Sequence, residues 1–303
     1  MTATEAMNTR KPLDRQEISA RLLRSAAKKS YDPVVDIDWT APIPPDLYGL
    51  SPEWSSLYGT PLWNGLTEEQ RVTLTTHEYC SISGVGIWFE GLLMQLMLRD
   101  VYGEDPAQPH VQWALTEIAD ECRHSVMFAR TAQTFGAPSY QPPPKIRALG
   151  KAFAAKGDGP AAYAAILVAE EILDIFQRDL MTDERVQPLT RATSRIHVVE
   201  EARHMRFARE EIARRAPELT KRQLRTHRTV VAAVAAIVAD NLVQPEVYAS
   251  VGLEPAEGKR AARANEHYAA KLRGAASGLV SFLRGNELIG GPSELLWKRA
   301  RLV

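Results

Sequence analysis

The chain contains one arrangement of metal-binding residue types twice. A single glutamate is followed 31 positions later by a Glu-x-x-His pair, and the whole arrangement recurs 80 positions further along the chain. The first copy is Glu90, Glu121 and His124, and the second copy is Glu170, Glu201 and His204. Residues three apart on a helix share a face, so each pair can direct its carboxylate and imidazole at one point. Two such pairs with two further glutamates are the ligand set of a dinuclear carboxylate site in a four-helix bundle.

Four glutamates that meet in one buried site nearly require a bound pair of metal ions. Four carboxylates balance the four positive charges of two divalent ions. Without metal, four carboxylates in a dry core would repel one another and carry a large desolvation cost, unless some were protonated. We therefore expect a di-iron or di-manganese site that reacts with O2 or carries out redox chemistry. We expect no catalytic residues beyond the metal ligands and no site for an organic cofactor.

His197 adds an imidazole to the second copy only. It stands at i, i+4 and i+7 with Glu201 and His204, which places all three on one helical face. Its counterpart in the first copy is Glu117. We interpret His197 as a further metal ligand; the alternative is a core histidine that hydrogen-bonds Glu201 one turn away. If its helix is regular, Glu117 faces the site. It could contact the metals there, or it could only hold a proton or hydrogen-bond a water beside them.

Glu170 is followed directly by a second glutamate, Glu171, so either residue could be the ligand. The shift of 80 positions selects Glu170. An apolar stripe at helical spacing, which includes Tyr163, Ile166 and Leu173, places Glu170 on the inward face. Glu171 is then turned away by about 100° and is expected outside the site.

A second carboxylate directly precedes each Glu-x-x-His pair and could orient a histidine of the other copy. Metal-bound histidines usually donate their second N–H to such an outer carboxylate. We expect Asp120 to lie near His204, and Glu200 near His124. Two arginines three positions further on would hold these carboxylates, unless all four residues form surface salt bridges. These arginines are Arg123 and Arg203.

Gly86 lies one turn before Glu90 on the same helical face. A glycine inside a helix costs about 1 kcal/mol relative to alanine, so its presence there needs a reason. We expect Gly86 either to leave room for a substrate beside the metals or to allow close helix packing.

Helical periodicity and stop signals predict an all-α fold. No segment alternates as a strand would, and the prolines at 142–144 predict a rigid crossover between two helix pairs. The pattern predicts a four-helix bundle with further N- and C-terminal helices. The long helices are expected at about 67–102, 109–136, 160–182, 187–214 and 221–248.

The two ends of the chain are expected to extend beyond the bundle. Residues 1–30 are polar and basic and are predicted to form a flexible tail with a short helix between 14 and 29. The proline-rich segment 31–60 is expected to wrap the bundle irregularly, and residues 259–303 to add one or two helices. We therefore divide the chain into a tail, residues 1–30, and one domain, residues 31–303.

Composition limits the function classes. The 37 basic and 37 acidic residues cancel, so the charge does not favour nucleic-acid binding. The two cysteines form no disulfide framework or metal motif, which is typical of a reducing, cytoplasmic setting. The start of the chain has no secretory signal, and the longest apolar run, residues 230–239, is too short to cross a membrane. We therefore expect a cytoplasmic protein that binds neither nucleic acid nor membrane.

At the repeated residues the chain resembles the p-aminobenzoate N-oxygenase (AurF-like) family of non-haem di-iron oxygenases. The resemblance covers residues 30–303 and includes flanking sequences. Its motifs are Trp88-Phe89-Glu90, residues 120–124, Glu170-Glu171, residues 197–204, residues 57–60, Met127-Phe128 and residues 243–248.

The resemblance implies a ferritin-like fold and a homodimer. It implies two iron ions per chain, with manganese at one position as an alternative, and an additional iron-binding histidine, which carries over to His197. It further implies that the centre uses O2 to oxidise a small amine at nitrogen, for an arylamine through hydroxylamine toward nitro. No flavin or nicotinamide motif is present, so electrons must come from an external reductase or a ferredoxin-type donor.

Two other functions stay open from the residues alone. One is another dinuclear-metal oxidase, such as a C–H hydroxylase, a desaturase or a manganese–iron oxidase. The other is a non-catalytic, ferritin-like iron-binding protein. The segments that extend beyond the bundle suit a closed pocket better than a storage cage.

Overall fold

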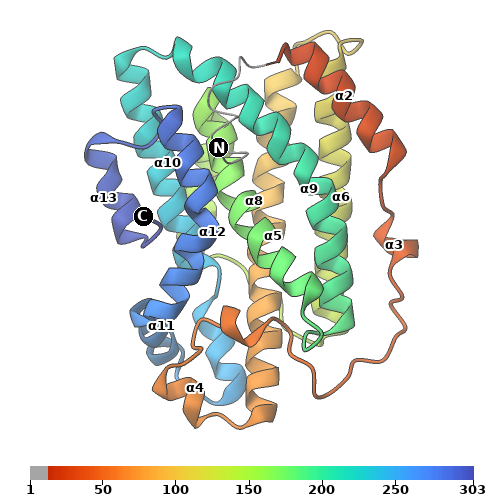
Figure 1. The fold of residues 1–303 in the computed structure, drawn as a ribbon, viewed down its shortest axis with the longest axis vertical. Coiled ribbons are helices and arrows are strands. Elements are labelled where there is room, and N and C mark those ends of the chain that lie inside the picture. Colours follow the sequence, from red (N-terminus) through yellow and green to blue (C-terminus); the bar gives the residue numbers. More distant parts are fainter. Residues whose placement is uncertain (1–12) are drawn as a thin grey trace.

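Four long helices surround the centre of the molecule. The computed structural model describes residues 13–303, and in this part of the chain the four helices run side by side as one bundle (Figure 1). They are α5 (Glu68–Val101), α6 (Pro109–Thr134), α8 (Gly159–Thr182) and α9 (Pro188–Arg215). The fold is all-α and ferritin-like, which confirms the predicted fold class. Within residues 13–303 the only β-type pairing is one isolated bridge between Tyr48 and Val186.

Local sequence explains where these helices begin. Thr67 and Gln70 form a capping box at the start of α5, in which each side chain accepts a hydrogen bond from the other residue's backbone N–H. The helices α6, α8 and α9 each have a proline in the first turn, where the missing N–H would have no helical partner anyway. Each of these helices therefore has a defined N-terminus.

The helix α8 is apolar on nearly all sides because other helices enclose it. It packs against α9 within the bundle, and against α10 (Lys221–Asn241) and α12 (Glu266–Gly285) outside it. A charged residue in the middle of α8 is therefore far from water and needs a partner inside the protein.

Helices near the N-terminus and near the C-terminus of the chain cover the bundle. The helix α2 (Arg15–Lys28) occupies the position of the short helix expected at 14–29 and lies against α6 and α9. On the opposite side, α10 and α12 are joined by α11 (Pro255–Ala264) and followed by α13 (Glu294–Arg299) (Figure 1). The loose tail expected for residues 1–11 lies outside the described residues, and the division of the chain at residue 30 stays a prediction.

Two connections differ from the predictions. The helix α10 ends at Asn241 and not near 248, because Pro245 cannot continue it and instead opens a 3-10 helix, η3 (Pro245–Val251). The crossover expected after residue 142 contains a further helix, α7 (Pro144–Lys156), for which proline is a favourable first residue. The segment 31–60 is mostly irregular, as expected, and contains only α3 (Pro33–Asp36) and η1 (Pro52–Trp54), before α4 (Pro61–Gly65).

Two segments are long and apolar enough to cross a membrane by length and composition alone. They are Glu68–Val101, which is α5, and Lys221–Val251, which covers α10 and η3. The second segment contains the apolar run at 230–239, which alone is too short to cross a membrane, and extends beyond it on both sides. In α5, 56% of the most apolar 18-residue stretch is buried inside the fold. The core helix of a protein that does not enter a membrane can be equally long and apolar. The expected absence of a membrane partner therefore stays a prediction.

Glu78 is a second buried carboxylate in α5, about three turns before Glu90. It is fully buried and accepts hydrogen bonds from the backbone N–H of Ser56 at 2.8 Å and from its hydroxyl at 2.5 Å. Its other oxygen, Oε2, has no hydrogen-bond partner. Burial raises the pKa of Glu78 to about 7, although the hydrogen bonds from Ser56 favour the charged form.

The raised pKa of Glu78 predicts a stability that falls as the pH rises. In the unfolded chain the pKa returns to about 4.5, so between these values the folded protein holds a proton that the unfolded chain releases. The free energy of unfolding should therefore decrease across this window, by about 3 kcal/mol from this group. Glu78→Gln should remove that decrease. Urea unfolding of both metal-free proteins at either end of the window measures it, and equal pH dependence in the two proteins would contradict the assignment.

Candidate metal centre

The seven side chains expected to bind metal meet in the centre of the four-helix bundle. Each is at most 2% exposed. The helix α5 contributes one of them, α6 two, α8 one and α9 three. They are Glu90, Glu121, His124, Glu170, His197, Glu201 and His204. Their ligand atoms form sets of three that lie within 4.8 Å of one another, such as the set of Glu121, His124 and Glu201.

Glu121 and Glu201 lie between the two histidines of the repeated motif. His124 Nδ1 is 3.1 Å from Glu121 Oε2 and 3.3 Å from Glu201 Oε1. His204 Nδ1 is 3.0 Å from Glu121 Oε1 and 3.0 Å from Glu201 Oε1. Each of these carboxylates therefore approaches both imidazoles, which is the position of a ligand shared by two ions.

The outer nitrogens of these histidines lie beside the carboxylates that precede the motif. His124 Nε2 is 2.8 Å from Glu200 Oε2, and His204 Nε2 is 3.3 Å from Asp120 Oδ2. Both pairings agree with the prediction. Because each Nε2–H donates to a carboxylate, the lone pair of each Nδ1 is left to face the centre.

Arginines hold these outer carboxylates, as the sequence predicts. Arg203 lies within 3.6 Å of both Asp120 and Glu200, and Arg123 pairs with Asp120. Glu200 also accepts a hydrogen bond from the backbone N–H of Tyr31 at 3.0 Å. Asp120, Glu200 and Arg203 are buried, so the alternative of surface salt bridges does not apply to them.

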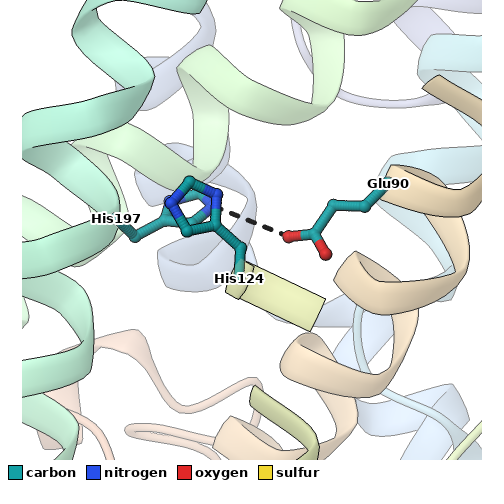
Figure 2. Close-up of side chains that lie close together, drawn as sticks. All are labelled: Glu90, His124 and His197. Atoms are coloured by element: carbon teal, nitrogen blue, oxygen red, sulfur yellow. Dashed lines mark ion pairs between the residues drawn. The ribbon is translucent and has the colours of Figure 1, made fainter. Parts of the chain in front are cut away.

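His197 presents its other nitrogen to the cluster. Its Nδ1 is 2.7 Å from Gln177 Oε1, which accepts the N–H, while Nε2 lies 3.7 Å from Glu90 Oε1 and 3.8 Å from Glu201 Oε1. Figure 2 shows Glu90 and His197 directed toward each other, with the ring of His124 beside that of His197. The centroids of these two rings are 4.7 Å apart. The hydrogen-bond partner of His197 is thus Gln177, and its free nitrogen faces the carboxylates.

Glu170 and Glu171 have opposite surroundings. Glu170 belongs to a set of ligand atoms with His197 and Glu201. Glu171 points away from the cluster and accepts two hydrogen bonds from Arg209, at 2.6 and 2.5 Å. The structure therefore places the two residues as the shift of 80 positions predicts.

Burial and mutual repulsion act strongly on these carboxylates. Burial, followed by the charge of Glu201, raises the pKa of Glu170 well above its usual value, and burial also raises the pKa of Glu90. Burial opposes protonation of His204, but Glu201 and Glu117 nevertheless raise its pKa well above its usual value. Without a bound cation, some of these carboxylates must therefore be protonated, or must be paired with protonated imidazoles.

Several carboxylate oxygens of the cluster have no hydrogen-bond donor. Such buried acceptors are costly and rare in native proteins. Carboxylate oxygens together with imidazole nitrogens are ligands suited to iron and manganese. A pair of divalent cations would satisfy these atoms, so the residues fit a dinuclear site. The unpartnered oxygens are Glu117 Oε2, Glu121 Oε1, Glu170 Oε2 and Glu201 Oε2.

Two contacts of the ligands were not anticipated from the sequence. Gln177 orients His197, and the hydroxyl of Ser125 donates a hydrogen bond of 2.5 Å to Glu90 Oε2. Gln177 lies seven positions after Glu170, so the same inward stripe on α8 contained a signal for it. Glu117, whose role the sequence left open, lies with Glu121 and His204, and burial raises its pKa to about 8.

A narrow cavity borders the ligands on the side of Gly86. Its open volume is only about 10 Å³, and Glu90, Glu170 and His197 form part of its wall. A Cβ atom built on Gly86 would meet no atom within 4 Å, whereas one on Gly84 would lie 2.2 Å from the backbone oxygen of Tyr140. Close packing therefore explains Gly84, and open space beside the ligands explains Gly86.

A larger hollow lies elsewhere in the molecule. Its volume is about 430 Å³, it lies between α10, α11, α12 and α13, and Lys259, Arg263 and Arg301 are among its lining residues. None of the seven candidate ligands lines it. We therefore associate the narrow cavity, and not this basic hollow, with the chemistry of the cluster.

Comparison with known proteins identifies relatives of the chain. The family described as p-aminobenzoate N-oxygenase AurF matches residues 12–286. Similar proteins include the uncharacterized proteins Mb0909 of Mycobacterium bovis and Rv0885 of Mycobacterium tuberculosis, each 26% identical over 214 residues. The match spans 68% of this chain and 63% of each relative's length.

We predict that Glu121→Ala strongly reduces metal binding, because Glu121 lies between both imidazoles. Loss of an outer hydrogen-bond partner of a metal ligand costs roughly 10- to 100-fold in affinity, and loss of a shared ligand should cost at least as much. Glu210→Ala is the control, since it removes a buried carboxylate of α9 outside the cluster. Metal analysis after equal loading measures the effect, and full metal content in Glu121→Ala would refute the assignment.

The adjacent glutamates of α8 provide a matched pair of variants. We expect Glu170→Gln to lose metal and oxidase activity, because it replaces an inward carboxylate by an amide that cannot balance the cations. Glu171→Gln should keep both, because it alters only the pair with Arg209. Iron per chain and O2 consumption by the reduced proteins are the readouts. The reverse ranking would mean that Glu171 is the ligand.

Proposed function

Because the chain belongs to the p-aminobenzoate N-oxygenase AurF family, we propose that it is a di-iron oxygenase that uses O2 to oxidise the nitrogen of a small amine. The observation that carries this proposal is the buried set of four carboxylates and three imidazoles from four helices. Family membership favours iron, with manganese at one of the two positions as the alternative.

The seven buried side chains would together hold the two ions. His124 and His204 would each bind one ion through Nδ1, the nitrogen that faces the centre. Glu121 and Glu201 lie between these imidazoles and would also help to hold the ions. The remaining ligands would be Glu90, Glu170 and His197.

Two ferrous ions held by these side chains would supply the redox chemistry with O2. The chain itself orients and shields this chemistry. Asp120 and Glu200 accept the outer N–H groups of the motif histidines, and Gln177 accepts that of His197, so each imidazole keeps one fixed orientation. The four helices keep bulk water away, since every candidate ligand is at most 2% exposed.

The substrate would occupy the narrow cavity beside Gly86. An amine in this cavity would lie next to Glu90, Glu170 and His197, and so next to the proposed ions. The helices that cover the bundle, α2 and α10 to α13, suit a closed pocket better than a storage cage, and this favours an oxygenase over an iron-storage protein.

Electrons for each turnover would come from another protein. The sequence contains no flavin or nicotinamide motif, so we propose a ferredoxin-type donor or a reductase as partner. A homodimer and a cytoplasmic location are proposed on the family resemblance and on the cysteine content.

The direct test is oxidation of an aromatic amine by the iron-loaded, reduced protein in the presence of O2. We expect products that carry oxygen on nitrogen, the hydroxylamine first, identified by mass spectrometry with labelled O2. Glu121→Ala is the inactive control. Oxygen incorporated only on carbon would favour another dinuclear-metal oxidase, and large mineral cores without product would favour iron storage.

A further inference from the structure

The cavity beside the metal ligands contains acidic residues but no basic ones. Glu90 and Glu170 belong to its wall, and no lysine or arginine of residues 13–303 lines it. We propose, resting on the function proposed above, that its substrate is an uncharged aromatic amine and that an amine carrying a carboxylate is excluded. This preference would differ from p-aminobenzoate, the anion from which the family takes its description.

The charge of the cluster leaves nothing to attract an anion. The four candidate carboxylate ligands would balance two divalent cations, so the filled site has no surplus positive charge next to the cavity. Two arginines of α9 already have partners: Arg203 lies within 3.6 Å of both Asp120 and Glu200, and Arg209 pairs with Glu171. A substrate carboxylate would therefore enter a buried space without a counter-ion, which is strongly unfavourable.

The side walls of the cavity favour an aromatic ring. Aromatic side chains line it: Tyr79, Phe89, Phe128 and Phe176, each at most 6% exposed. Because its open volume is only about 10 Å³, room for about one water, its walls must move apart to admit a substrate. Aromatic walls pack best against another aromatic ring, in edge or offset contact. A planar aromatic amine therefore suits this cavity better than a branched one.

One neutral donor could recognise the far end of such a ring. Gln177 belongs to the cavity wall, and its Oε1 accepts the N–H of His197. Its Nε2 amide group carries two N–H donors that could donate to an occupant. An uncharged oxygen acceptor, such as a carboxamide, ether or hydroxyl, would match this donor. Gln177 would then contact the substrate with one atom and a metal ligand with the other.

The test compares 4-aminobenzamide with 4-aminobenzoate, which share a ring and differ mainly in charge. Binding of each to the iron-loaded protein is measured by isothermal titration calorimetry. We expect 4-aminobenzamide to bind more than about tenfold more tightly. Equal or tighter binding of 4-aminobenzoate in the cavity, or binding of neither compound there, would overturn the proposal.

Three variants at two positions locate the binding. Gly86→Leu fills the cavity, so binding that survives it belongs elsewhere, for example to the basic hollow lined by Lys259 and Arg263. Ser83→Arg introduces a cation into the cavity wall and should shift the preference toward 4-aminobenzoate, while Ser83→Gln, of similar length but neutral, should not. Equal preference in both Ser83 variants would contradict the electrostatic argument.

Product analysis with the same two compounds separates this inference from the proposed function. If 4-aminobenzamide binds in the cavity but is not oxidised at nitrogen, the specificity argument holds and the proposed N-oxygenation fails. If both compounds bind and are oxidised at nitrogen to the same extent, the function holds and the specificity argument fails.

Discussion

Four carboxyl groups that share one dry interior are the constraint on which the rest of the structure depends. The helices α5, α6, α8 and α9 each bring one glutamate to the same space, where an unpartnered carboxylate is very costly. Three imidazoles offset part of this cost, and two divalent cations would offset the rest. The buried carboxylates of the cluster therefore destabilise the metal-free bundle. The same carboxylates are the reason to propose a dinuclear metal site.

The layers around the cluster follow from the same constraint. The histidines can direct one nitrogen inward only because a fixed acceptor takes the proton of the other, and Asp120, Glu200 and Gln177 supply these acceptors. The segment after α2 completes this layer, since the backbone N–H of Tyr31 donates to Glu200 and the backbone oxygen of Lys29 accepts from Arg203. Part of the segment that the sequence presented as a tail is therefore in contact with the outer shell of the site.

Residues of the repeated motif and their immediate neighbours could be predicted from the sequence, and residues outside the repeat whose role depends on contacts between helices could not. The spacing of 80 positions distinguished Glu170 from Glu171, and adjacency to the motif identified Asp120 and Glu200. Gln177 was missed because its contact with His197 depends on the relative rotation of α8 and α9, which no single helix pattern encodes. The open space beside Gly86 was equally undecidable, since a glycine that opens a cavity and one that allows close packing look alike in sequence.

The most direct test of the central claim is an anomalous X-ray diffraction experiment at the iron absorption edge on crystals of the iron-loaded protein. The account predicts two anomalous peaks per chain, one next to His124 Nδ1 and the other next to His204 Nδ1, with Glu121 and Glu201 between them. A single peak, no peak inside the bundle, or iron bound only outside these seven side chains would contradict it.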